Sequence, residues 1–232
     1  MDSSTGLAGP TKRVFQIGAA GGVGRPLAAR LVAEGHVVSG MHRKPEQGDA
    51  VRATGARPVL GDLIGDAAET IAQRMAGHDA VVFSAGAHGT GFDLTTSIDG
   101  RGLEKAVAAC EIAGIRRFLL VSVFMDAGRA RDRSEGFEHY MAVKRSADVA
   151  LAESALDWVI LRPGTLTDAS GTGRVTLGHA IAYGSVPRDD VAHVIAVLLF
   201  QPEINRVCLE LTEGELLVSD AVAALVPRRA KL

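Results

Sequence analysis

The chain has 232 residues, of which 47% are apolar, and a formal net charge of −2 at pH 7. This size suffices for one large α/β domain, and the small charge argues against a nucleic acid or an anionic membrane as partner. No run of 18 apolar residues is present, so no membrane-spanning helix is predicted. We expect a small-molecule partner and a monomer or homodimer.

The beginning of the chain lacks the basic and apolar segments of a secretion signal. We therefore expect a flexible tail at residues 1–12 on a cytoplasmic protein, followed by a single domain at residues 13–232 with a small substrate-pocket region near its end. The cysteines, Cys110 and Cys208, fall in helix-like and strand-like patterns, which predicts free thiols and no metal site.

A glycine-rich turn follows the first predicted strand, at residues 14–17, and leads into a helix-period pattern ending near residue 34. Residues without Cβ let a phosphate approach the backbone, and the helix start supplies free N–H groups and the positive end of its dipole. The alternative is an ordinary turn. The residues predicted to bind a dinucleotide here are Gly18, Ala19, Ala20, Gly21, Gly22, Val23 and Gly24.

Three basic residues, His42, Arg43 and Lys44, follow the strand predicted at residues 36–41. In a dinucleotide-binding fold this position meets the adenosine ribose, where NAD-specific proteins carry Asp or Glu. Basic groups suit a 2′-phosphate, and a guanidinium can also stack on adenine. We therefore predict NADP(H) in preference to NAD(H), with Arg43 as the best candidate to bind the phosphate and His42 as a further cofactor-binding residue; a solvated basic turn is the alternative.

Two further predicted strands, at residues 57–60 and 79–83, end in turns that suit the same ligand. Asp62 and Leu63 follow the first, where the carboxylate either accepts a hydrogen bond from adenine or caps a helix beginning near Asp66. The second strand is apolar enough to be central in a parallel sheet. It ends in small residues against which a cofactor can lie, Ser84, Ala85 and Gly86.

A helix is predicted over residues 96–113 and a strand over residues 116–122, which places Ser122 where ligands bind open α/β sheets. The charged segment 126–138 predicts an exposed loop, either a lid or a plain solvated loop. Tyr140 and Lys144 follow, four residues apart and hence on one helix face. A neighbouring ammonium lowers a tyrosine pKa toward the working range of a general acid, so this pair is a candidate catalytic site.

Pro163 and Gly164 follow the strand predicted at residues 157–161. The proline removes a donor and the glycine permits an unusual φ, so we expect a sharp turn that covers the nicotinamide. Residues 170–185 predict a strand pair closing the substrate pocket, followed by a helix (187–200), a strand (207–211) and a helix (215–225). The expected fold is α/β, a doubly wound parallel sheet of Rossmann type.

Five segments occur in an order that resembles the short-chain dehydrogenase/reductases. More narrowly, the chain is similar to their small atypical NAD(P)-binding branch, which includes bacterial NAD(P)H-binding oxidoreductases and is similar to flavin/biliverdin reductases and NmrA-like proteins. The segments are Gly18-x2-Gly21-x2-Gly24, Gly61-Asp62-Leu63, Val121-Ser122, Tyr140-x3-Lys144 and Leu161-Arg162-Pro163-Gly164.

The resemblance implies that Tyr140 donates a proton to a carbonyl oxygen as hydride arrives from NADPH. It implies that Lys144 lowers the tyrosine pKa and holds the nicotinamide ribose, and that Ser122 orients the carbonyl. Val123 stands where relatives often carry a second serine. The resemblance also implies which residues bind each part of the cofactor. Gly18, Gly21 and Gly24 would bind the pyrophosphate, Arg43 the 2′-phosphate, Asp62 and Leu63 the adenine, and Pro163 and Gly164 the nicotinamide.

The expected function is NADPH-dependent reduction of a small carbonyl or conjugated substrate. The alternatives are a non-catalytic NADP(H)-binding redox sensor, and a flavin or quinone reductase that does not need Tyr140. Little chain follows Gly164 compared with the nucleotide-sugar epimerases of the family, which argues against a sugar nucleotide as substrate.

Overall fold

The computed structural model describes residues 10–87, 91–128 and 134–226. The strands are β1 (Arg13–Ile17), β2 (Val37–His42), β3 (Arg57–Leu60), β4 (Ala80–Phe83), β5 (Arg117–Val121), β6 (Asp157–Pro163), β7 (Thr165–Thr167), β8 (Arg174–Gly178), β9 (Ser185–Pro187), β10 (Val207–Glu213) and β11 (Leu216–Leu217). The helices are α1 (Gly24–Ala33), α2 (Gly48–Arg52), α3 (Ala68–Met75), α4 (Phe92–Thr95), α5 (Gly102–Ala113), α6 (Glu135–Glu153), α7 (Arg188–Leu199) and α8 (Val218–Ala223). A 3-10 turn, η1 (Pro45–Gln47), and a π-helical segment, η2 (Thr96–Arg101), complete the described elements.

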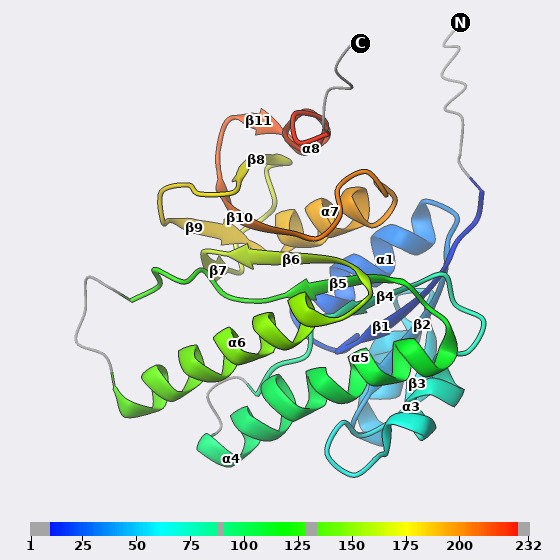
Figure 1. Cartoon of the computed structure of the whole chain (residues 1–232). Coiled ribbons are helices and arrows are strands. Elements are labelled where there is room, and N and C mark those ends of the chain that lie inside the picture. The colour runs from blue at the N-terminus through cyan, green and yellow to red at the C-terminus, as the bar shows by residue number, and fades with distance from the viewer. Residues whose placement is uncertain (1–9, 88–90, 129–133, 227–232) are drawn as a thin grey trace, which may run out of the picture.

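Nine of the described strands form one large sheet with helices on both faces (Figure 1). The other two, β7 and β9, pair in a separate two-stranded sheet. The order of the large sheet is β11-β8-β10-β6-β5-β4-β1-β2-β3. The neighbours from β10 to β3 all pair in parallel, whereas β8 runs antiparallel to both β10 and β11. This doubly wound arrangement confirms the predicted Rossmann-type α/β fold.

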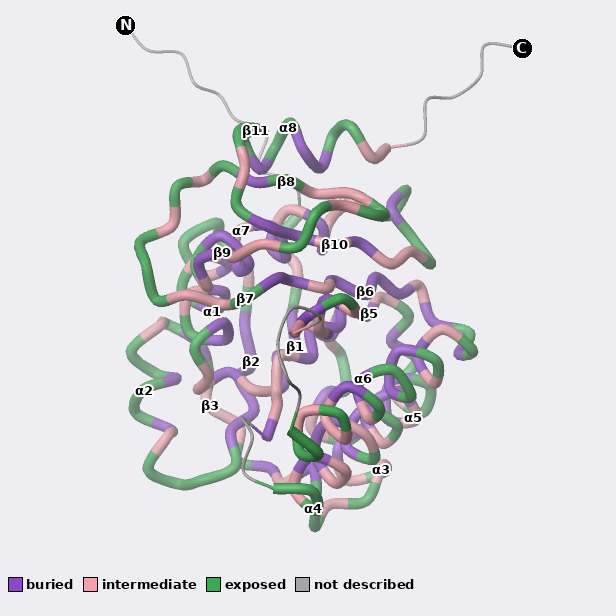
Figure 2. The backbone as a smooth tube through the Cα atoms, turned by 90° about the vertical axis from the view of Figure 1, so that its left-hand side faces the viewer, coloured by how far each residue is buried: buried purple, intermediate pink, exposed green. Residues whose placement is uncertain are grey.

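Each face of the sheet has its own apolar core. In β1, Val14 packs with α1, α7 and α8 on one face, while Phe15 and Ile17 pack with α3, α5 and α6 on the other, as the two-residue period of a strand requires. All four residues of β4 are buried, which confirms its central position. In Figure 2 buried stretches likewise run through the interior of the molecule, along the strands β5 and β6. Cys110 and Cys208 are free thiols, as predicted.

The direction in which successive strands are added to the sheet reverses between β1 and β4, because β2 and β3 lie on one side of β1 and β4 lies on the other. α1, which follows β1, covers one face, whereas α5, which follows β4, covers the other. In open α/β sheets the diverging connections leave a crevice at the carboxyl ends of such strands, where ligands bind. The fold therefore places the glycine turn and the end of β4 at the same crevice.

Three predicted elements differ from the structure. The helix predicted over residues 215–225 is shorter, because β11 occupies its start and α8 spans only Val218–Ala223. The helix predicted over residues 96–113 begins earlier and is interrupted, running through α4, η2 and α5. The strand pair predicted within residues 170–185 is wrong, because β8 pairs with β10 and β11 while β9 pairs with β7. Glycine-rich segments specify strand register weakly, so the exposed edge of β10 rather than the local sequence selects the partner of β8.

The loop predicted at residues 126–138 ends earlier than expected, because α6 begins at Glu135. The Oγ of Ser134 caps this helix by accepting a hydrogen bond from the Phe137 N–H at 3.2 Å. Residues 129–133 of the loop and residues 1–9 of the predicted tail lie outside the described residues. Within the described ranges, no helix combines the length and apolar character needed to cross a membrane.

Candidate active site

Two adjoining cavities open at the carboxyl ends of the central strands. The first, of about 340 Å³, is lined by Arg43 and is called the Arg43 cavity; the second, of about 540 Å³, is lined by Tyr140 and is called the Tyr140 cavity. Both share a wall formed by Gly21, Ser84, Ala85 and Gly86. An elongated ligand can therefore extend from one cavity to the other past the end of β4.

Gly18 and Gly24 of the glycine turn are required by packing. Gly18 has φ +88°, and a Cβ built on it would lie 2.5 Å from the Ala85 nitrogen. A Cβ on Gly24 would lie 2.2 Å from the Gly18 carbonyl oxygen. At Gly21 the nearest atom to such a Cβ is 3.2 Å away. The strict requirement for glycine thus comes from the crossing of β1, α1 and the end of β4.

The residues of the predicted turn divide into a lining set and a buried set. Gly18, Ala20 and Gly21 line the Arg43 cavity, and Gly21, Gly22 and Val23 line the Tyr140 cavity. Ala19 and Gly24 are buried and line neither cavity. These two residues therefore support the turn from behind.

The N-terminus of α1 presents backbone donors to the cleft. Within the described part of the chain, the N–H groups of Gly22 and Val23 have no hydrogen-bond acceptor. The buried carboxamide of Gln16 fixes the turn by donating from Nε2 to the Gly24 carbonyl at 2.7 Å. Free N–H groups at the positive end of a helix dipole suit an anion such as a phosphate.

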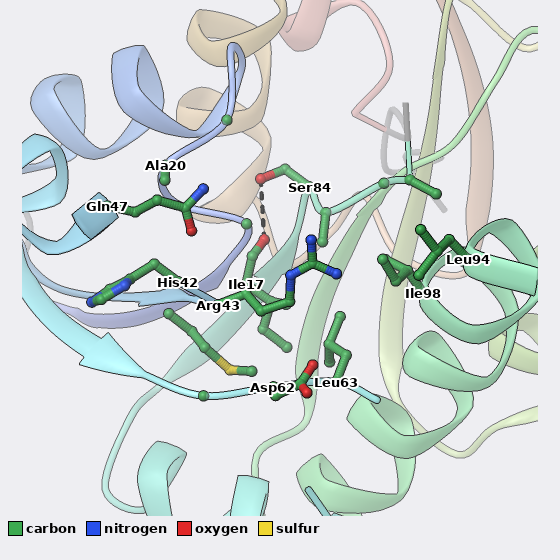
Figure 3. A pocket seen from close by; sticks show the side chains of 17 residues that line it. Ile17, Ala20, His42, Arg43, Gln47, Asp62, Leu63, Ser84, Leu94 and Ile98 are labelled. Atoms are coloured by element: carbon green, nitrogen blue, oxygen red, sulfur yellow. Dashed lines mark hydrogen bonds between the residues drawn. The ribbon is translucent and has the colours of Figure 1, made fainter. Parts of the chain in front are cut away.

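The Arg43 cavity contains one of the predicted cations. Figure 3 shows the Arg43 guanidinium in the middle of the cavity, between Ser84 and Leu63. His42 also lines the cavity, but its ring is buried and its Nδ1 donates to the Lys44 carbonyl at 2.9 Å. Lys44 itself lines neither cavity. Arg43 is therefore the predicted phosphate-binding cation whose charge the structure places inside the cavity.

Asp62 and Leu63 line the same cavity from the end of β3. The Asp62 carboxylate accepts a hydrogen bond from the Ile64 N–H at 3.0 Å, and its own N–H donates to Asp66 Oδ2 at 2.6 Å. The N-cap of α3 is Ala67, and no side chain caps it. The alternative that Asp62 caps this helix is therefore wrong, and its carboxylate instead stabilises the turn beside the cavity.

Tyr140 and Lys144 of α6 both line the Tyr140 cavity, as does Ser122 after β5. Lys144 is 3% exposed; its Nζ donates to the Val121 carbonyl at 3.1 Å and lies 3.6 Å from Oδ1 of Asp99. Asp99, in η2, is 2% exposed and also accepts a hydrogen bond from the Ala87 N–H at 2.9 Å. Lys144 and Asp99 thus form a buried ion pair within the cavity wall.

The Ser122 hydroxyl is directed at a carboxylate of α6. Its Oγ donates to Asp148 Oδ1 at 2.5 Å, and Asp148 Oδ2 accepts from the Arg162 Nε at 2.9 Å. Burial raises the pKa of Asp148, although the Ser122 and Arg162 hydrogen bonds favour the carboxylate. The proton of Ser122 is therefore engaged by Asp148 rather than directed into the cavity.

The expected lowering of the Tyr140 pKa is wrong. Burial raises the pKa of Tyr140, and the nearby carboxylates of Asp99 and Asp148 raise it further. Lys144 does not reverse this effect, because its ammonium is paired with Asp99. The phenol therefore remains protonated at neutral pH and can act as a hydrogen-bond or proton donor.

Pro163 and Gly164, predicted to back the nicotinamide, are buried and line neither cavity. Gly164 does not have the positive φ that the sequence suggested. A Cβ there would lie 2.2 Å from the Gly184 carbonyl oxygen, so glycine is needed for close packing. Leu166, two residues further on, lines the Tyr140 cavity instead.

Sequence reasoning missed two charged residues that line the Tyr140 cavity, Asp99 and Arg188. Asp99 lies within a segment whose pattern predicts a continuous helix, and Arg188 opens α7. The available signal for Asp99 was an acidic residue directly after Ile98, on the buried side of that helix. No local pattern distinguishes Arg188 from an ordinary surface arginine.

Comparisons with known proteins find relatives that match most of the chain. The chain is 37% identical over 215 residues to YhfK of Bacillus subtilis (strain 168), which is named an uncharacterized sugar epimerase; the match covers 92% of this chain and 100% of YhfK. It is 35% identical over 204 residues to the UPF0659 protein YMR090W of Saccharomyces cerevisiae, covering 82% of this chain and 88% of that protein.

A solved structure from Bacillus halodurans, provisionally named an NAD-dependent epimerase/dehydratase, matches with a TM-score of 0.84 and 36% identity. The match covers 92% of this chain and 100% of that chain. Residues 18–202, which include the glycine turn and both cavities' main walls, match the NAD(P)H-binding family. The chain therefore belongs to the NAD(P)H-binding family of Rossmann-type proteins.

Proposed function

We propose that this protein is an NADPH-dependent oxidoreductase that reduces a small carbonyl or conjugated substrate, with Tyr140 as the proton donor. The observation that carries the proposal is the joint position of Tyr140 and Lys144 in one cavity that adjoins the glycine turn. A dinucleotide held by the turn would bring its nicotinamide toward this cavity, next to a protonated phenol.

The residues present fit NADPH. Arg43 would bind the 2′-phosphate, since its guanidinium lies in the first cavity. Asp62 and Leu63 would contact adenine, and the free N–H groups of Gly22 and Val23 would face the phosphates. The bound nicotinamide supplies the hydride.

In this mechanism Tyr140 donates a proton to the substrate oxygen as negative charge develops there. The raised pKa keeps the phenol protonated, which favours reduction; the reverse reaction would need the phenolate. Lys144, held by Asp99 and the Val121 carbonyl, would contact the nicotinamide ribose. The Ser122 hydroxyl donates to Asp148, so it has no part in this proton transfer.

A second candidate is epimerisation of a sugar, which the name of YhfK suggests at 37% identity. Such a reaction would oxidise and then reduce the substrate on one bound dinucleotide, with no net consumption of cofactor. The two candidates therefore differ in a measurable quantity, the amount of NADPH consumed per substrate converted.

The test is a panel of small aldehydes, ketones, enones, quinones and flavins, with NADPH absorbance and product analysis as readouts. We expect wild-type protein to consume NADPH with at least one carbonyl or enone. Tyr140→Phe should lower kcat about 10²-fold to 10⁴-fold while the Kd for NADPH changes less than about twofold. The matched control is Tyr183→Phe, because Tyr183 lines neither cavity and its hydroxyl bonds Thr165.

Each contrary outcome identifies another function. NADPH binding without turnover of any substrate would favour the redox sensor. Turnover of flavins or quinones that is indifferent to Tyr140→Phe would favour a reductase without an acid. Conversion of a sugar without net NADPH consumption would favour the epimerase.

A further inference from the structure

Arg188, the first residue of α7, lies directly on the glycine turn. A Cβ built on Gly22 would lie 2.7 Å from Cδ and 2.9 Å from Nε of Arg188. Both residues line the Tyr140 cavity. The arginine side chain therefore occupies the space that any larger residue at position 22 would need, at the point where α1 begins.

The guanidinium has only a weak counter-ion. Its Nη1 lies 2.7 Å from Oδ1 of Asp168, whose side chain is 91% exposed, whereas that of Arg188 is 30% exposed. An ion pair this open to water contributes little and is readily exchanged. Among the described residues, no second acceptor bonds the Arg188 guanidinium, which carries five N–H donors.

The positive end of α1 lies in the same cavity. The N–H groups of Gly22 and Val23 lack acceptors among the described residues, and α1 has no acidic residue in its first turn. In the first turn of α7, the buried Asp190 is engaged by the N–H groups of Thr172 and Gly173. A helix terminus and a guanidinium that meet without a buried carboxylate between them form a site for an oxyanion.

We propose that Arg188 binds the diphosphate of the dinucleotide against the start of α1, with Asp168 as its exchangeable counter-ion. The proposal rests on the proposed function, because it takes NADPH as the ligand. Gly22 is then a glycine because Arg188 lies on it. An anionic group of the substrate is the other source of the same chemistry, but the position on the turn itself favours the diphosphate.

The first test measures the Kd of NADPH by fluorescence for wild-type protein and Arg188→Gln. We expect Arg188→Gln to weaken binding about tenfold or more, because a charge-assisted contact to phosphate is lost. Asp168→Asn should tighten binding about twofold, since the arginine no longer leaves an ion pair. The matched control is Arg25→Gln, which removes a charge from the first turn of α1 without touching either cavity.

A second measurement uses adenosine 2′-monophosphate, which carries no diphosphate. Its Kd should be the same for wild-type protein and Arg188→Gln. In a double-mutant cycle on NADPH binding, Gly22→Ala should weaken binding less in the Arg188→Gln background than alone, because both changes displace the same side chain. Thermal unfolding should be unchanged by Arg188→Gln, since its ion pair is exposed.

Wild-type affinity for NADPH in Arg188→Gln would overturn the proposal, as would a rise confined to the KM of an anionic substrate. Additive effects of Gly22→Ala and Arg188→Gln would refute the role of Gly22. These failures leave the proposed function intact as long as wild-type protein binds NADPH. If wild-type protein binds no nicotinamide dinucleotide, the proposed function fails as well.

Discussion

The Arg43 cavity takes most of its walls from the ends of β1, β2, β3 and β4 and the segments that directly follow them, and eight of its 17 lining residues are Gly, Ala or Ser. The Tyr140 cavity instead gathers charged side chains from η2, α6 and α7, elements far apart in the chain. Small residues and the Arg43 guanidinium characterise the first cavity, whereas paired charges characterise the second. The two halves of the cleft should therefore respond differently to substitution.

The charges around the Tyr140 cavity are coupled. Lys144 pairs with Asp99, and Arg162 pairs with Asp148, which also binds Ser122. Buried charges are tolerated only when they are paired, so removing one partner leaves the other unfavourable. Asp99 and Asp148 both act on the pKa of Tyr140. A single change here alters stability and proton transfer together. Arg43, by contrast, is exposed and does not belong to this group of coupled charges.

The largest effect is expected at the glycine turn. Gly18→Ala should lower the free energy of unfolding by about 2–5 kcal/mol, because alanine disfavours the positive φ and its Cβ would overlap the end of β4. Gly21→Ala should cost less than about 1 kcal/mol in stability yet weaken NADPH binding about tenfold. Urea unfolding and fluorescence titration measure the two effects. Equal destabilisation by both variants would contradict this division of roles.

Asp99→Asn tests the coupling in the Tyr140 cavity. The amide keeps an acceptor for the Ala87 N–H but removes the charge that pairs with Lys144, so stability should fall by about 2–3 kcal/mol. Losing a carboxylate that raises the Tyr140 pKa must lower that pKa. A general acid works while protonated and loses activity as pH rises through its pKa, so the alkaline limb of kcat should move to lower pH.

The control for this variant is Asp93→Asn, which removes an exposed charge from α4. It should leave both stability and the pH profile as in wild-type protein. An alkaline limb that does not move in Asp99→Asn would mean that Tyr140 is not the group that titrates in turnover.

The accuracy of the sequence predictions follows the same division. Residues that follow strands, such as Arg43, Asp62 and Ser84, could be placed in a common cleft because parallel strands end at one edge of a sheet. The spacing of Tyr140 and Lys144 put both on one side of a helix. Local patterns carry this information.

What could not be predicted depends on which segments pack together. The ion pair between Asp99 and Lys144 needs η2 to lie against α6. The direction of the Tyr140 pKa depends first on the burial of the phenol and then on the nearby carboxylates of Asp99 and Asp148. Ser122 was predicted to orient a substrate, but its partner Asp148 lies 26 residues away on α6. Arg188 reaches the glycine turn only because α7 packs beside α1.

Arg43→Ala tests the role of the Arg43 guanidinium in the first cavity. The Kd for NADPH should rise about 10–100-fold, equivalent to about 1.4–2.7 kcal/mol, because a guanidinium–phosphate contact is lost. The Kd for NADH, which lacks the 2′-phosphate, should change less than about threefold. The matched control is Lys44→Ala, whose side chain lines neither cavity. Equal losses for NADPH and NADH would refute the proposed preference for NADP(H).

The smallest effect is expected behind the Arg43 cavity, at Asp66. Its carboxylate accepts hydrogen bonds from the Asp62 N–H and from Arg74 Nη1, each at 2.6 Å, and so stabilises the turn that carries Asp62. Partial burial raises the pKa of Asp66, but these two donors lower it by more, so its pKa lies below the ordinary value. Asp66→Asn should therefore reduce stability by about 0.5–1 kcal/mol at pH 7.

A carboxylate with a depressed pKa in the folded protein contributes stability above its unfolded pKa, which is about 3.9. This contribution is lost as pH falls through the folded pKa, so urea unfolding of Asp66→Asn and wild-type protein should converge in acid. Asp49→Asn is the control, because its pair with Arg52 is exposed. A difference for Asp66→Asn that persists unchanged into acid would show that the turn beside the Arg43 cavity depends on the shape of Asp66 rather than its charge.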